Sequence, residues 1–234
     1  MELLEKISTP FKALSFKEKE HQYLVKGEPL KGSVSGLIKQ FYNTPDFNAI
    51  APYSAAKRGI TTEEIQKEWR DNNLESITRG SRVHLFGENY PFNRKLIPSC
   101  PQEKAVVKFW NDLPEHIILV GVELRMYHFL KLFGGTADII LFDTKTQTYI
   151  IADYKTNKSL TKNFQGKMMT GPFSHLLDCP LNHYVIQLSY YQILLEQIGI
   201  KISKRIIIHL DLEGNYQLIN TDDVTGILRQ TLNT

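Results

Sequence analysis

Two acidic residues on the strands of one predicted β-hairpin constrain this chain more than any other feature. Residues 134–158 read GGTADIILFDTKTQTYIIADYKTNK, so two apolar runs flank a polar turn at 143–148. A turn that is symmetric about its centre places Asp138 opposite Asp153. Opposed side chains have Cβ atoms roughly 4.5–5.5 Å apart, so two carboxylates there repel unless they share a proton or bind a cation. The hairpin therefore predicts a functional site.

Lys155 adds an amine to the same face, because it lies two residues after Asp153 and strand side chains alternate. Acids of this kind can hold a divalent metal ion, and an ammonium beside them can orient water or neutralise developing charge. Asp-x-Lys alone is common at solvated hairpin ends. The apolar run at 150–152 indicates instead that Asp153 lies at the edge of a core.

The remaining pattern places most predicted helices before the predicted strands. A small hairpin is expected at 14–31, helices at 33–42, 46–59, 61–77, 79–90, 102–113 and 182–198, and strands at 117–127, 135–143, 148–155, 204–211 and 215–219. Residues 156–181 read as a loop with a short helical piece. This order predicts an α/β (α+β) fold, with a mixed central β-sheet flanked by helices and a helical N-terminal elaboration. No linker divides residues 1–234, so one domain is expected, with an N-terminal part at 1–78, a core at 79–211 and a C-terminal strand and helix at 212–234.

Composition excludes several classes of protein. Hydrophobic residues make up 42% of the chain and charged residues 23%, values typical of a globular protein rather than a disordered one. Two cysteines cannot supply an iron–sulfur cluster in a monomer. A net charge of +3 neither establishes nor excludes a nucleic-acid surface. No apolar run reaches the roughly 18 residues of a membrane span, and the N-terminus lacks a signal-peptide pattern. We expect a cytoplasmic protein without membrane contact.

The sequence Gly135-x-x-Asp138 followed by Asp153-Tyr154-Lys155 resembles the PD-(D/E)XK nuclease superfamily, with Ala137 where the family name has Pro. The resemblance implies a restriction-endonuclease-like core. It also implies that the two acids hold one or two Mg²⁺ or Mn²⁺ ions and that Lys155 takes part in cutting phosphodiesters.

Further segments resemble the RecB-like branch of that superfamily. Residues 79–84, RGSRVH, are similar to its Gly-Thr-x-x-His element, which implies that His84 is a metal ligand. Gln187 and Tyr191 are similar to its signature helix, which lies against the active site, and Glu123 matches an auxiliary acid near the metal. The structural alternatives are a packed histidine, a core tyrosine and a half-buried strand residue.

These resemblances imply a metal-dependent exonuclease that acts on single-stranded or duplex DNA ends, in phage or in replication and recombination. Lambda-exonuclease-type enzymes and the mitochondrial genome maintenance exonuclease, which also lack an iron–sulfur cluster, are the closer analogy. Arg79, Arg82 and Lys158 are candidates for contacts with the nucleic-acid backbone. An endonuclease on the same fold and an inactive nucleic-acid-binding module are the alternatives, and the pattern is compatible with any oligomeric state.

Overall fold

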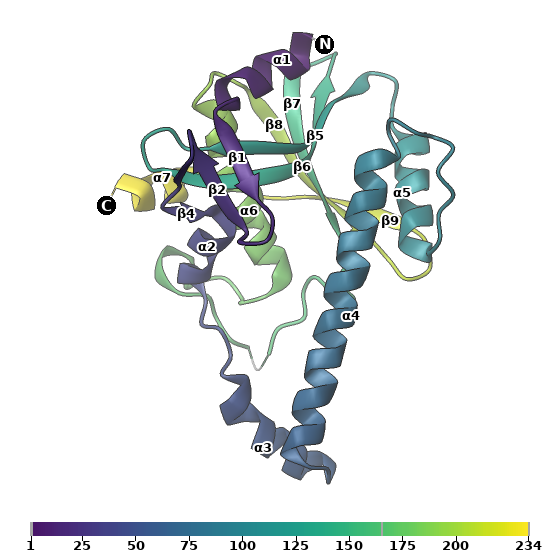
Figure 1. The fold of residues 1–234 in the computed structure, drawn as a ribbon, viewed down its shortest axis with the longest axis vertical. Helices are drawn as coiled ribbons and strands as arrows, with labels where there is room; N and C mark the ends of the chain where they lie inside the picture. The colour runs from purple at the N-terminus through teal and green to yellow at the C-terminus, as the bar shows by residue number, and fades with distance from the viewer. Residues whose placement is uncertain (1, 165, 234) are drawn as a thin grey trace.

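A six-stranded mixed sheet forms the centre of the protein (Figure 1). The computed structural model describes residues 2–164 and 166–233. β5 is antiparallel to β6, β6 to β7 and β8 to β9, whereas β7 and β8 run parallel. The sheet strands are β4 (Gly32–Ser33), β5 (Ile117–Tyr127), β6 (Phe133–Asp143), β7 (Thr148–Lys155), β8 (Ile202–Leu210) and β9 (Tyr216–Asn220). The predicted α+β class with a mixed central sheet is confirmed.

Helices cover both faces of the sheet, because alternate side chains of β6 and β7 enter two separate cores. Ile140 and Ile151 face a core that includes α1 (Glu2–Ser8), α2 (Val34–Ile38) and α6 (Pro180–Glu196). Ile139 and Ala152 face the other core, under α4 (Thr62–Asn89) and α5 (Pro101–Asp112). α3 (Phe47–Arg58) packs on the distal half of α4, and the two form an arm that extends beyond the sheet (Figure 1).

α4 is one continuous helix of 28 residues, where the sequence pattern predicts two helices at 61–77 and 79–90. Its start is as expected, since Thr61 and Glu64 form a capping box. The expected break before Gly80 is wrong, because one glycine costs a helix only about 1 kcal/mol. Packing of α4 on the sheet outweighs the cost of Gly80. At Gly87, further along the helix, the backbone lies so close to β7 that a Cβ would overlap the Tyr154 ring.

The remaining elements follow the predicted order with local differences. The N-terminal hairpin is a separate three-stranded sheet of β1 (Leu14–Lys17), β2 (Gln22–Val25) and β3 (Glu28–Pro29). The loop expected at 156–181 is present up to the start of α6, and its described residues include a 3₁₀ turn at Gly171–Phe173. The chain ends in the expected helix, α7 (Thr225–Asn233). Sequence patterns predict neither α1 nor β4. Within the described residues, no helix combines the length and the apolar character that crossing a membrane requires.

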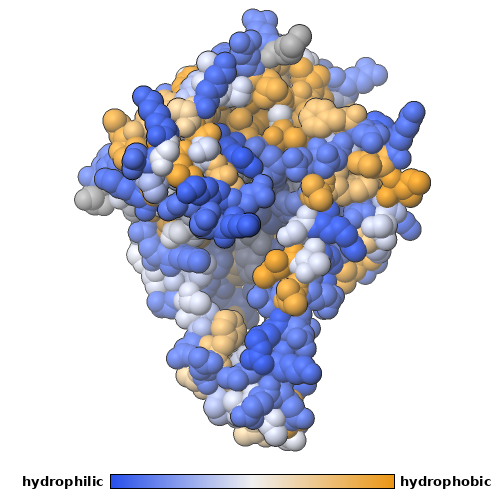
Figure 2. Space-filling view, in the orientation of Figure 1, coloured by the Kyte–Doolittle hydropathy of each residue, from blue (hydrophilic) through white to orange (hydrophobic). Residues whose placement is uncertain are grey.

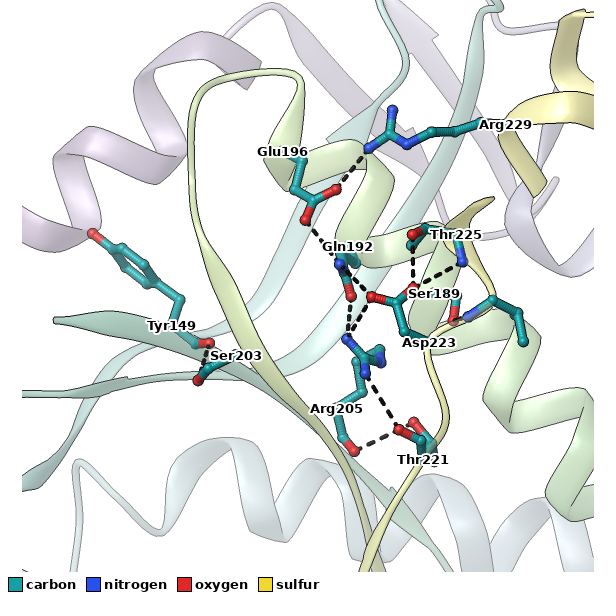
Figure 3. Close-up of polar contacts among 11 residues, drawn as sticks. Tyr149, Ser189, Gln192, Glu196, Ser203, Arg205, Thr221, Asp223, Thr225 and Arg229 are labelled. Atoms are coloured by element: carbon teal, nitrogen blue, oxygen red, sulfur yellow. Dashed lines mark hydrogen bonds and ion pairs between the residues drawn. The ribbon is translucent and has the colours of Figure 1, made fainter. Parts of the chain in front are cut away.

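A buried polar network fixes α6 to β8 and to the C-terminal segment (Figure 3). Arg205 of β8 is 8% exposed, and its guanidinium donates to the side chain of Gln192 on α6. The same nitrogen lies 3.4 Å from Asp223, and Glu196 of α6 pairs with Arg229 of α7 at 2.6 Å. A buried cation needs such partners. The network therefore sets the position of α6, which carries two predicted site residues.

Candidate metal centre and active site

The predicted site lies where β6 and β7 separate. Their ladder runs from Asp143 opposite Thr148 to Ile139 opposite Ala152, which is the register that the symmetric turn predicts. The ladder ends one pair before the two predicted acids. Beyond this point, β6 pairs in parallel with the short strand β4 at residues 133–134. On the edge of β6 that faces β7 and β4, residues 135–138 therefore have no paired strand. This gap gives room for side chains from several elements.

Three carboxylates from three neighbouring strands converge at this gap. The β5–β6 ladder is paired on both sides of Glu123, in a register that puts Glu123 opposite Asp138. Asp153 follows the last β6–β7 pair and is only 1% exposed. Glu123 has a φ of 47°, in the left-handed region that costs a non-glycine residue roughly 1–2 kcal/mol. A strained acid beside two others indicates a functional site more than a structural one.

α4 contributes an imidazole to these acids. His84 Nδ1 lies 3.1 Å from Asp138 Oδ2, and the same oxygen accepts the Tyr154 backbone N–H at 3.0 Å. One possible ligand atom each from His84, Glu123 and Asp138 lies within 4.8 Å of the other two. Asp153 does not belong to this group of closely spaced ligand atoms, which was found among the described residues. One nitrogen and two carboxylate oxygens suit a divalent ion such as Mn²⁺.

Lys155, at the end of β7, adds an ammonium to the site. Its ammonium forms an ion pair with the Asp153 carboxylate and lies 4.3 Å from the centre of the Tyr184 ring. Burial opposes the charge of Lys155, but Asp153 and Asp138 outweigh this effect and raise its pKa. Lys155 therefore stays protonated at neutral pH. Sequence reasoning misses Tyr184, although its spacing to Gln187 puts both on one face of α6.

The pKa values of the other groups reflect their crowding. Burial disfavours the charged form of His84, but the adjacent Asp138 raises its pKa to about 9. Burial favours protonation of Asp138, yet His84 and Lys155 keep its pKa below the ordinary value. Burial, together with Asp138 and Glu88, raises the pKa of Glu123 to about 7. Burial and Asp138 also raise the pKa of Asp153. The metal-free site thus holds more protons than the unfolded chain would at neutral pH.

Gln187 and Tyr191 lie under the acids on the α6 side of the sheet. Gln187 Nε2 donates to the Tyr191 hydroxyl at 2.8 Å, and Tyr191 is 4% exposed. Its ring packs so closely on Gly135 that a Cβ there would come within 2.8 Å of it. Burial, Asp153 and Asp138 raise the pKa of Tyr191. Tyr191 therefore belongs to the core and also borders the acids, and the half-buried Gln187 holds its hydroxyl.

The three cations predicted to bind nucleic acid have different positions. Arg79 and Lys158 line one cavity between α4 and the loop after β7. Arg82 instead lies near α5, with its Nε 3.4 Å from the carboxylate of Glu103, which is 3% exposed. Arg82 therefore helps to hold α4 against α5, a role that residue spacing alone does not reveal.

No model of a known protein family matches the chain, and a search of curated proteins also finds no match. Function is therefore inferred from the residues and their geometry.

Proposed function

We propose that the protein is a metal-dependent nuclease of the PD-(D/E)XK type, RecB-like branch, which hydrolyses phosphodiester bonds at DNA ends. The observation that carries the proposal is the convergence of Glu123, Asp138 and Asp153 with His84 and Lys155 at one gap in the sheet. Clustered carboxylates repel one another: burial first, and then Asp138 and Glu88, raise the pKa of Glu123. A bound cation would relieve this repulsion, which supports the proposal.

The side chains fit a divalent ion. His84, Glu123 and Asp138 would hold Mg²⁺ or Mn²⁺, and the imidazole favours Mn²⁺ because nitrogen suits the softer ion. Asp153 is next to Asp138 and is the candidate for a further ligand. The bound metal would supply an activated water and polarise a phosphate oxygen. Cys100 and Cys179 are both buried and lie far apart in sequence. Two cysteines do not supply the four ligands that an iron–sulfur cluster usually has.

The other residues of the site position charge around the scissile phosphate. Lys155 is a fixed cation, held by Asp153 on one side and by the Tyr184 ring on the other. It would neutralise charge that develops on the phosphate or orient the attacking water. Gln187 holds the Tyr191 hydroxyl, and burial together with the nearby Asp153 and Asp138 raises the pKa of that tyrosine, so both residues would have a positioning role beside the acids.

The test is digestion of end-labelled single-stranded and duplex DNA with Mg²⁺, with Mn²⁺ and with EDTA. We expect cleavage only with metal, faster with Mn²⁺, and at least 100-fold slower for Asp138→Asn. His175→Gln is the matched control, because His175 is an exposed histidine outside the site. Loss of linear substrate with circular DNA left intact would support an exonuclease, and cutting of circles would indicate the endonuclease alternative. DNA binding without any cleavage would indicate an inactive binding module.

A further inference from the structure

A cavity of about 500 Å³ lies between α4 and the loop that follows β7. Figure 2 shows the surface hollowed beside the middle of α4. Thr156 lines the cavity and directly follows Lys155, so the cavity adjoins the proposed active site. Gly80 of α4 lies close to Thr156: a Cβ on this glycine would be 3.7 Å from the threonine hydroxyl oxygen. The helix and the loop therefore close one side of the cavity.

The lining of this cavity suits a phosphate beside an apolar group. Arg79, Lys158 and Lys162 line it, and none of the described lining residues is acidic. Arg79 pairs with Glu75 of α4 at 3.1 Å, so the two exposed lysines supply most of the positive charge. Pro180, at the start of α6, also lines it, so the positive end of that helix dipole is nearby. Ile77 adds an apolar wall and is 57% exposed. Cations can contact the phosphate of a nucleotide, and an exposed apolar side chain can contact its sugar or base.

The loop wall of the cavity is held in place by hydrogen bonds. The Asn157 side chain accepts a hydrogen bond from the Tyr184 hydroxyl at 2.7 Å, and its backbone carbonyl lies 2.7 Å from His209 Nε2. Further along the loop, the Lys162 backbone N–H donates to the Ser159 hydroxyl at 3.0 Å. The wall is therefore preformed, which lowers the entropy cost of binding a ligand.

We propose that this cavity receives a nucleotide of an unpaired DNA strand next to the scissile phosphate, so that the substrate class is single-stranded DNA. This inference rests on the proposed nuclease function. The volume is in the range of a single small ligand, so the cavity can take one nucleotide but not a base-paired duplex. The cations would bind backbone phosphates, and Ile77 would contact a sugar or base.

The test measures DNA binding in EDTA, where a metal-dependent nuclease does not cut. Anisotropy titrations compare a labelled 10-nucleotide strand with a 20-base-pair duplex, for wild type and for the double variant Lys158→Ala, Lys162→Ala. Both lysines are exposed, so the fold is retained. The matched control is Lys19→Ala, Lys145→Ala, which removes two exposed lysines from β-turns outside the cavity.

We expect the wild type to prefer the single strand and the cavity variant to bind it at least 10-fold more weakly. The salt dependence of binding should also fall, by about 0.7 in slope for each phosphate that the variant no longer neutralises. An equal decrease with the control variant, or tighter binding of the duplex by wild type, would overturn the inference. If the binding results are as expected but no DNA is cut with Mg²⁺ or Mn²⁺, the subsite stands and the nuclease function fails.

Discussion

Metal binding at the proposed site should release protons, because the metal-free protein holds them on the candidate ligands. His84 has a pKa of about 9 in the fold, so at pH 7 it carries about one proton that a metal ion must displace. Glu123 has a pKa of about 7 and carries about half a proton more. We therefore expect about 1.5 protons to be released for each Mn²⁺ bound at pH 7. The competition at His84 alone costs about 2.7 kcal/mol of apparent binding free energy at that pH.

The sign of the pH dependence follows from these two groups. As pH rises from 7 to 8, both lose protons, and the apparent affinity for Mn²⁺ should increase roughly 15-fold. For His84→Gln, only Glu123 contributes, so the increase should fall to about twofold. A histidine without a role in the site would leave the increase unchanged.

Isothermal titration calorimetry measures the proton release directly. Mn²⁺ is titrated at pH 7 in two buffers with different ionisation enthalpies, and the difference in heat gives the number of protons. His84→Gln should lower that number by about one, whereas the control His175→Gln should leave it unchanged. Binding without proton release in wild type would refute the assignment of His84 and Glu123 as ligands.

Three further predictions concern individual residues. Since the fold raises the pKa of Glu123 from 4.5 to about 7, the metal-free protein should lose stability as pH rises through that window. Urea denaturation at pH 8 should therefore show Glu123→Gln about 2–3 kcal/mol more stable than wild type without metal, and a less stable variant would contradict this. Lys155→Met should bind Mn²⁺ as tightly as wild type in calorimetry but turn over DNA at least 100-fold more slowly. If it fails to bind metal, Lys155 instead holds Asp153 in place. Gly87→Ala should cost about 1–3 kcal/mol in urea denaturation, because the added methyl group overlaps the Tyr154 ring, and an unchanged midpoint would contradict this packing.

The structure also shows why spacing alone ranks the candidate metal ligands differently from geometry. Spacing favours Asp138 and Asp153, because a symmetric turn opposes them. In the fold, the pairing of β6 with β7 ends just before these two acids, and β6 then pairs with β4. The Asp153 carboxylate forms an ion pair with Lys155. Glu123 then joins Asp138 and His84, because β5 keeps its register with β6 past this point. β4 has only two residues, which is too short for a periodic pattern to indicate.

The cations show the same division between local pattern and tertiary packing. Arg79 and Arg82 belong to one sequence element, and nothing in their spacing separates their roles. The helix puts Arg79 beside the loop after β7 and turns Arg82 toward the buried carboxylate of Glu103 on α5. Both arginines have an acidic partner: Arg79 contacts Glu75 within α4, whereas the partner of Arg82 depends on where α5 docks and lies 21 positions away in sequence.

Local periodicity is enough to predict the sheet strands of the second half, the hairpin register, the cap at Thr61 and the mixed α and β class. Alternation and turn symmetry are properties of neighbouring residues, so they can be read without a structure. The unbroken course of α4, which brings His84 to Asp138, is visible only in the folded protein. It depends on Gly87 and Val83 packing against the sheet, and burial between segments so distant in sequence leaves no local signal.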